Sequence, residues 1–221
     1  MLVGHVAVSF AARRVEPAIS LGTWVLAAML ADLLWCAFMI AGIEQVSFGP
    51  ARGAANYLDA RNIALSHSLL MDAIWAALFA AAYFLQRRRC RGAWLLFFVV
   101  LSHWPLDWIS HRPDMPLAPA LHRYFGLGLW ASIPKTIIVE GGLWVAAIIL
   151  YTRAKCLNTR SSAYAFWIGV VLLTVIWYNN LAGPPPPNPD MAPFASLILF
   201  SLVIAWAYGI DRPGAPAAKR P

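Results

Sequence analysis

Residues 92–114 read GAWLLFFVVLSHWPLDWISHRPD, an apolar stretch that ends in a ridge of ionisable side chains. Its segment 92–110 is close to the length of about 20 residues that a transmembrane helix needs. His103, Asp107, His111 and Asp114 recur at spacings of four, four and three residues, which on a helix places them within an arc of roughly 80°. Ionisable groups at membrane depth cost several kcal/mol unless they are paired, hydrated or bound to an ion. The ridge is therefore a candidate metal site.

The composition of the whole chain is typical of a membrane protein. Hydrophobic residues make up 61% of the 221 residues and charged residues only 12%, whereas a soluble globular domain contains about 25% charged residues. This composition excludes an ordinary soluble domain. Six segments are apolar enough and near the length needed to cross a bilayer: residues 18–43, 63–86, 92–110, 128–151, 162–182 and 192–210.

These six segments leave only short loops between them. Because irregular backbone cannot face lipid, the sequence predicts an all-α fold, a polytopic transmembrane bundle of about six membrane helices plus a short N-terminal helical segment. We expect one integral membrane domain over residues 1–221. It divides into a short N-terminal or re-entrant segment at 1–14, the helical bundle at 18–210 and a flexible cytoplasmic tail at 211–221.

The positive charges of the loops predict the orientation of the chain. If the chain ends and alternate loops lie in the cytoplasm, twelve Lys and Arg residues lie inside and four outside. An excess of positive charge belongs on the cytoplasmic side, so both termini are expected there. The net charge of +7 follows from this bias and from contact with lipid headgroups. We expect no nucleic-acid partner.

Ionisable side chains of several predicted helices share one level of the bilayer. Counted at about 1.5 Å per residue from the outer ends of the segments, the outer half contains nearly all of them, and the inner half almost none. A water-filled pocket open to the outside requires such a shared level. The residues are Asp32, His67, Asp72, His103, Asp107, Lys135 and Glu140.

Four of these residues are candidate metal ligands. His103 and Asp107 are one helical turn apart and can present a nitrogen and an oxygen to one divalent ion, or form a simple buried ion pair. His67 lies between two serines and is either a ligand or a core histidine capped by their hydroxyls. Asp32 has apolar neighbours on both sides, so its carboxylate needs a cation, most economically one shared with the histidines.

The remaining ionisable residues have two interpretations each. Lys135 either extends towards the membrane surface or faces an anionic substrate group. Glu140 is a candidate proton acceptor or a partner for another helix. Asp72 lies on a different face of its helix from His67, so it either supports the ligands from behind or pairs helices, and is not a ligand itself. His111 and Asp114 border a proline at the membrane surface, where they complete the site or are solvated.

His5 belongs to the segment MLVGHVAVSFAARR at residues 1–14, which the positive charges place on the inner side. If this segment enters the bilayer as a re-entrant half-helix, it brings His5 towards Asp32. If it does not, His5 lies outside the site.

The order of these motifs resembles that of a known family. The pair Gly4-His5, an Asp in the first long apolar helix, a His-Ser pair opening the next helix and then an HxxxD block resemble the YdjM-type family of inner-membrane metal-dependent hydrolases, over roughly residues 1–115. The resemblance implies a divalent metal, zinc first, and a multi-pass protein of a bacterial-type inner (plasma) membrane. It also implies the ligands His5, Asp32, His67, His103 and Asp107, with His111 as a further one.

The chain departs from the pattern of that family in two places. The family's PDxD block reads ADLL at residues 31–34, so the second acid is absent. Its HRGxTHS block corresponds to ARNIALSHS at residues 60–68, which lacks the leading histidine and has a longer gap. We therefore expect one or two metal ions.

Together these patterns predict metal-assisted hydrolysis of an ester or phosphoester at the outer membrane interface. Glu140 or Asp114 would act as general base, and Lys135 or Arg112 would hold an anionic group. A lipid or lipid-linked small molecule is the expected substrate, because amphiphiles reach such a pocket most directly. Two other classes compete with this one. A transporter or channel would continue its ion or proton relay into the inner half, and a scaffold would hold a fully coordinated metal without an open position.

Overall fold

A computed structural model describes residues 1–48, 58–59, 61–154, 157, 159–184 and 188–210. The tail expected at 211–221 lies outside the described residues. The all-α class is confirmed, since the two short hairpins are the only strands in the described part of the chain. The first is β1 (Ser47–Phe48) with β2 (Leu58–Asp59), and the second is β3 (Met115–Pro116) with β4 (Tyr124–Phe125), both antiparallel.

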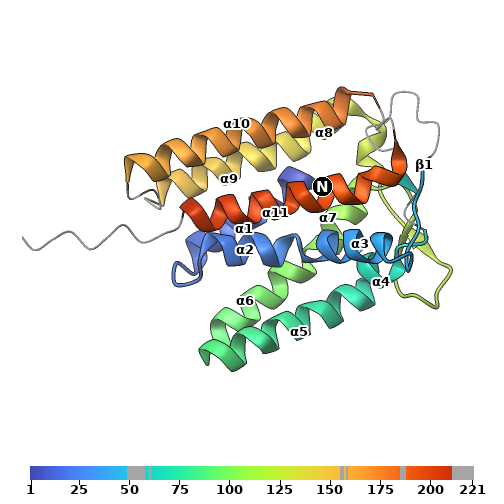
Figure 1. The fold of residues 1–221 in the computed structure, drawn as a ribbon, viewed down its shortest axis with the longest axis horizontal. Helices are drawn as coiled ribbons and strands as arrows, with labels where there is room; N and C mark the ends of the chain where they lie inside the picture. The colour runs from blue at the N-terminus through green and yellow to red at the C-terminus, as the bar shows by residue number, and fades with distance from the viewer. Residues whose placement is uncertain (49–57, 60, 155–156, 158, 185–187, 211–221) are drawn as a thin grey trace, which may run out of the picture.

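The helices follow one another with short connections (Figure 1). The first half of the chain forms α1 (Leu2–Val15), α2 (Leu21–Ala28), α3 (Leu30–Ile40), α4 (Ala64–His67), α5 (Leu69–Arg87), α6 (Cys90–Leu101) and α7 (His103–Ser110). The second half forms the 3₁₀ turn η1 (Leu129–Ala131), α8 (Ile133–Thr136), the π-helix η2 (Ile137–Gly141), α9 (Gly142–Arg153), α10 (Arg160–Ala182), the 3₁₀ turn η3 (Pro189–Met191) and α11 (Ala192–Ile210).

Five helical segments among the described residues are long and apolar enough to cross a membrane: Leu69–Arg87, Cys90–Ser110, Ile133–Arg153, Arg160–Ala182 and Ala192–Ile210. The sixth expected segment, 18–43, is divided. Its helices α2 and α3 meet at Met29 with a bend of 54°, the geometry of a broken span or of a re-entrant loop, and counted as one span they bring the total to six. The expectation of about six membrane helices is therefore confirmed, with a break that the apolar pattern does not indicate.

Helix α1 is the central helix of the bundle. At about 1.5 Å per residue its 14 residues are too short to cross a bilayer, yet most of its N-terminal half is buried, between α2 and α9. Phe10 is fully buried, and its ring contacts the rings of Trp144, Tyr151 and Phe166 from α9 and α10. The aromatic core thus fixes a helix whose other end places His5 in the interior.

Two glycines let α11 approach its neighbours. A side chain at Gly22 of α2 would overlap the ring of Tyr208, and one at Gly169 of α10 would overlap the ring of Trp206. Small residues at helix contacts allow this kind of close packing in a membrane bundle. The indole N–H of Trp206 also donates to the carbonyl of Ala165, which fixes α11 against α10.

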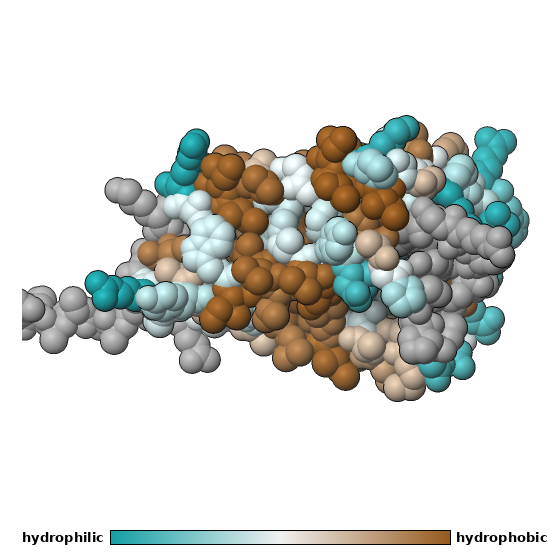
Figure 2. All heavy atoms as spheres, turned by 90° about the horizontal axis from the view of Figure 1, so that it is seen from above, coloured by the Kyte–Doolittle hydropathy of each residue, from teal (hydrophilic) through white to brown (hydrophobic). Residues whose placement is uncertain are grey.

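The surface has the distribution that a bilayer requires. Apolar side chains cover the middle of the face formed by α9 and α10, and hydrophilic side chains gather towards the two ends (Figure 2). On α10 the large side chains of Ile168, Val171 and Leu172 are more than half exposed. The hairpins and the start of α11 lie at one end of the bundle, and the turn between α5 and α6, the end of α9 and the start of α10 lie at the other (Figure 1). This arrangement agrees with alternate loops on opposite sides of the membrane.

Candidate metal centre

Side chains from three helices bring nitrogen and oxygen donors to one buried point. The Nε2 atoms of His67 (α4) and His103 (α7) lie 3.3 Å apart. Asp32 Oδ1 (α3) lies 3.7 Å from the first and 3.8 Å from the second. Asp107 Oδ2 (α7) lies 3.9 Å from His67 Nε2 and 3.1 Å from His103 Nε2. Asp32, His67 and His103 form a group whose geometry can hold a metal ion.

The donor separations fit a single tetrahedral ion. Metal–ligand bonds of about 2.0–2.1 Å place the corners of a tetrahedron about 3.3–3.4 Å apart, and the five measured separations run from 3.1 to 3.9 Å. Two imidazoles and two carboxylates are also a donor set that divalent transition metals and zinc accept. The structure thus brings side chains that are distant in the sequence to within the reach of one ion.

The orientation of His103 is set by a carbonyl oxygen. Its Nδ1 lies 2.9 Å from the carbonyl oxygen of Ala28, the last residue of α2. Because a carbonyl only accepts hydrogen bonds, Nδ1 carries the proton and donates. In the neutral ring Nε2 is then unprotonated, and its lone pair points at the other donors. This is the arrangement that metal-binding histidines have in proteins.

His67 is oriented by a residue that sequence reasoning missed. Its Nδ1 lies 2.8 Å from Ser66 Oγ, and Ser66 Oγ lies 2.6 Å from Glu44 Oε2. The side chains of Glu44 and Ser66 are both buried. Ser66 is one of the two serines noted beside His67 in the sequence, but Glu44 follows α3 in a loop with no motif around it. No local signal in the sequence indicates its contact with Ser66.

Several acceptor atoms therefore converge in a buried place. The Nε2 lone pair of the neutral His103 faces His67 Nε2 beside the carboxylates of Asp32 and Asp107. Such a set is unfavourable in a buried place unless a cation lies between the donors. Asp32 is the most open of the four, with its side chain 17% exposed, while the other three side chains are at most 6% exposed.

His5 lies at the edge of this centre, which answers the question left open by the sequence. Its ring stacks on that of His103 with centroids 3.8 Å apart, and its Nε2 is 3.2 Å from Asp107 Oδ1. His5, His103 and Asp107 form a second group able to hold a metal ion. The buried amino group of Met1 contacts the same carboxylate oxygen at 2.9 Å. Asp107 thus contacts the Met1 amino group and His5 through Oδ1, and faces His67 and His103 through Oδ2.

Glu140 approaches from the π-helix η2. Its side chain is buried, and its carboxylate accepts the indole N–H groups of Trp130 and Trp177 while Oε1 has no further partner among the described residues. The carboxylate also interacts electrostatically with Asp107 and with the Met1 amino group. π-helical turns frequently occur at functional sites. Glu140 is thus close to the centre but not among its converging donors.

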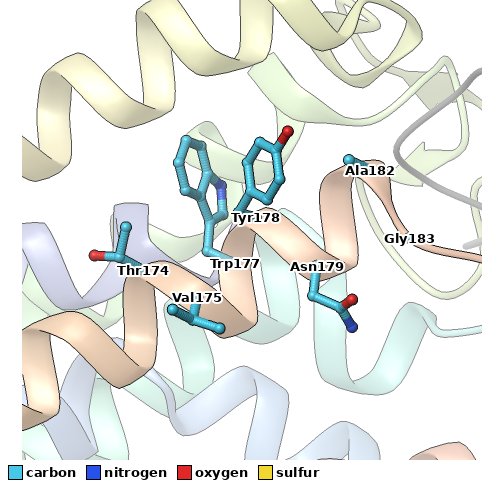
Figure 3. A pocket seen from close by; sticks show the side chains of 7 residues that line it. All are labelled: Thr174, Val175, Trp177, Tyr178, Asn179, Ala182 and Gly183. Atoms are coloured by element: carbon cyan, nitrogen blue, oxygen red, sulfur yellow. The ribbon is translucent and has the colours of Figure 1, made fainter.

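Trp177, a hydrogen-bond partner of Glu140, also lines a groove on α10. This groove of about 480 Å³ runs along the last turns of α10 and is lined mainly by apolar atoms (Figure 3). Its lining residues are Thr174, Val175, Trp177, Tyr178, Asn179, Ala182 and Gly183. None of them is a candidate ligand, so the groove is separate from the metal centre.

The other predicted site residues lie apart from the converging donors. His111 Nδ1 is 3.1 Å from Asp114 Oδ1, and Arg112 pairs with the same carboxylate. The His111 ring contacts Trp130, whose N–H donates to Glu140. His111 is thus engaged with Asp114 and does not enter either metal-binding group found among the described residues. Lys135 is exposed on α8.

Asp72 has an unusual environment on α5. Its side chain is fully buried, and neither carboxylate oxygen has a hydrogen bond of normal geometry among the described residues, although the N–H of Trp104 faces it. It interacts electrostatically with His103, Asp107 and Asp32. The expectation that Asp72 is not a ligand agrees with the two groups of converging donors, and its charge still acts on the centre.

Comparison with known proteins identifies one family. No curated protein and no solved structure matches the chain. The family model described as the YdjM inner membrane protein matches residues 1–182, which extend from α1 to the end of α10 and include every donor of the centre. The sequence resemblance over roughly residues 1–115 is confirmed and extended. The chain belongs to the YdjM inner membrane protein family.

Proposed function

We propose that this protein is a membrane-embedded, metal-dependent hydrolase of an ester or phosphoester. The observation that carries the proposal is the meeting of the Nε2 atoms of His67 and His103 with Asp32 and Asp107, at separations of 3.1–3.9 Å. Bound in this set, a divalent cation, zinc first, would supply Lewis-acid activation of water and of the scissile group.

The residues around the centre have separate roles in the proposal. Glu140 is buried, and its Oε1 has no hydrogen-bond partner in the part of the chain that the structure describes, so it is a candidate to accept a proton from the attacking water. The indole groups of Trp130 and Trp177 hold its carboxylate in position. Asp114 orients His111. Lys135 is exposed and available to hold an anionic headgroup.

A lipid or lipid-linked molecule is the substrate class that fits the location. The centre lies inside a bundle whose outer surface is apolar over its middle. Its most accessible donor is Asp32 on the broken span α2–α3. A substrate approaching Asp32 comes from the membrane or its interface, where amphiphiles are concentrated.

A transporter or channel is the competing function. A relay through the membrane needs ionisable groups along its whole length. Among the described residues, the buried carboxylate and histidine side chains are Glu44, His67, Asp72, Asp107, His111, Asp114, Glu140, His5 and His103. None of these belongs to the second half of α1, α5, α9 or α10, or to α11. Their confinement to one part of the bundle favours a pocket.

Metal analysis of the purified protein tests the centre. We expect about one ion per chain in the wild type, and loss of that ion in His103→Ala and in Asp107→Ala, because each removes a donor. His122→Ala is the matched control, since His122 is exposed in the loop before β4 and should leave the metal content unchanged. A wild-type protein that carries no metal after purification without chelators and does not bind added zinc would overturn the proposal.

Turnover on a panel of lipid phosphoesters and carboxyl esters tests the chemistry. Glu140→Gln should keep the metal and lose about 10²–10⁴-fold in rate, the usual contribution of a general acid or base. A metal-loaded wild type that hydrolyses none of the panel would favour the scaffold, in which the metal only fixes helix packing.

A further inference from the structure

The buried carboxylate of Glu44 accepts hydrogen bonds from two backbone N–H groups and from one side chain. Its Oε1 accepts the backbone N–H groups of Leu65 and Ser66, at 2.8 and 2.9 Å, and its Oε2 contacts Ser66 Oγ at 2.6 Å. The first two bonds satisfy donors at the start of α4. The third reaches a hydroxyl that touches His67 Nδ1 at 2.8 Å. One carboxylate thus joins the loop after α3 to a candidate ligand on α4.

The single hydroxyl proton of Ser66 decides the state of His67. Two acceptors compete for it, Glu44 Oε2 at 2.6 Å and the carbonyl oxygen of Ile63 at 3.3 Å. A short bond to an ionised carboxylate is the stronger of the two. The hydroxyl therefore donates to Glu44, and its oxygen has lone pairs left for the imidazole. His67 Nδ1 must then be the donor towards Ser66.

The proton on Nδ1 of His67 determines what Nε2, the other nitrogen of the ring, can bind. With the proton on Nδ1, Nε2 of the neutral His67 presents its lone pair to His103, Asp32 and Asp107. The opposite tautomer would place an N–H there and block ligation. We infer that Glu44 is a positioning residue which, through Ser66, holds His67 in the tautomer that binds the metal. This inference rests on the proposed metal centre, although its first test does not need the metal.

The histidine nitrogens of the metal-free protein provide that first test. In a long-range ¹H–¹⁵N spectrum of protein labelled at histidine, with the His67 signals assigned by their loss in His67→Ala, Nδ1 should be protonated and Nε2 bare. In Glu44→Gln the amide N–H₂ can donate to Ser66 Oγ, so the hydroxyl can donate to His67 and the opposite tautomer should become populated. A His67 signal in the same tautomer in both proteins would overturn the inference, whether or not the protein binds metal.

Zinc affinity, measured by competition with a chromogenic chelator, provides the second test. Glu44→Gln and Ser66→Ala should each weaken zinc binding by about 10- to 100-fold, the usual effect of removing a partner of a ligating histidine. Glu44 acts only through Ser66, so the double variant should bind no more weakly than Ser66→Ala alone. Losses that add in the double variant would mean that Glu44 acts by another route.

Two controls separate this role from folding and from the proposed function. Ser68→Ala changes the neighbouring serine, whose hydroxyl accepts the Met71 N–H at the start of α5, and should keep the wild-type affinity. Glu44→Gln retains an amide oxygen for the Leu65 and Ser66 N–H groups, so its unfolding temperature should stay near that of the wild type. If the wild type binds zinc and His103→Ala does not, while Glu44→Gln binds as tightly as the wild type, the centre stands and the positioning role fails.

Discussion

At the scale of single residues, metal binding depends on which atom of each side chain is not already engaged in a hydrogen bond. Imidazole has two nitrogens, and a hydrogen bond to one of them decides what the other can do. His103 donates to the carbonyl of Ala28, and His67 faces a hydroxyl held by Glu44. His5 differs from both, because its Nδ1 is buried without a partner among the described residues. We therefore place His67 and His103 before His5 as ligands.

Asp72 provides a prediction at this scale. Its carboxylate is buried without a hydrogen bond of normal geometry, so in the metal-free protein its charge is costly. Asp72→Asn should raise the stability of the metal-free protein, on the order of 1–3 kcal/mol, while weakening zinc binding because one nearby negative charge is lost. Thermal unfolding with and without chelator measures the first effect, and competition with a chelator the second. Lower stability of the metal-free variant would show that Asp72 makes a bond that the protein needs.

At the scale of secondary-structure elements, the break between α2 and α3 prepares the site. Residues 27–31 read AAMLA and contain neither Pro nor Gly, so composition does not explain the 54° bend. Kinks without these residues arise where a side chain inserts into the helical hydrogen-bond ladder. His103 is such a side chain, since it donates to the Ala28 carbonyl at the end of α2. The Ala28 carbonyl at the break accepts the His103 N–H and so orients the imidazole ring. The helix that begins after the break, α3, carries Asp32.

The two serines beside His67, Ser66 and Ser68, form different hydrogen bonds, and this difference gives a prediction at the scale of the helix. Ser68 begins α5 and accepts the N–H of Met71 at 3.3 Å, which is the bond of a helix N-cap. Ser68→Ala should therefore cost about 1 kcal/mol of stability and leave the metal content unchanged. Thermal unfolding and metal analysis of the same preparation check both parts. Loss of metal in this variant would mean that the start of α5 itself positions His67.

At the scale of the whole molecule, the orientation in the membrane remains a prediction. The turn between α5 and α6 contains the arginine cluster at residues 87–91 and the exposed Cys90, and both termini are predicted to lie on its side. In Cys156→Ser, Cys90 is an exposed thiol and Cys36 is buried. A membrane-impermeant maleimide should label Cys90 only after spheroplasts are opened.

The opposite end of the bundle supplies the control for this measurement. A cysteine introduced as Arg123→Cys lies in the exposed loop before β4 and should be labelled in intact spheroplasts. Labelling of Cys90 in intact spheroplasts would reverse the orientation and place the hairpins in the cytoplasm.

The sequence by itself determined the membrane class, the apolar segments and the residues able to bind a metal. Hydropathy and helical spacing are local properties, so they are readable along the chain: His103 and Asp107 share a helix face wherever that helix packs. The pattern also showed that His5, Asp32 and His67 have metal-binding chemistry, though not that they meet one another.

The tertiary structure alone decided which donors converge and which hydrogen bonds orient the histidine rings. The burial of α1 depends on rings from α9 and α10, and it is this packing that brings His5 to His103. Glu44 and the Ala28 carbonyl act through contacts across 22 and 75 residues of chain. No periodicity spans such separations, because contact between distant segments depends on which helix faces pack together.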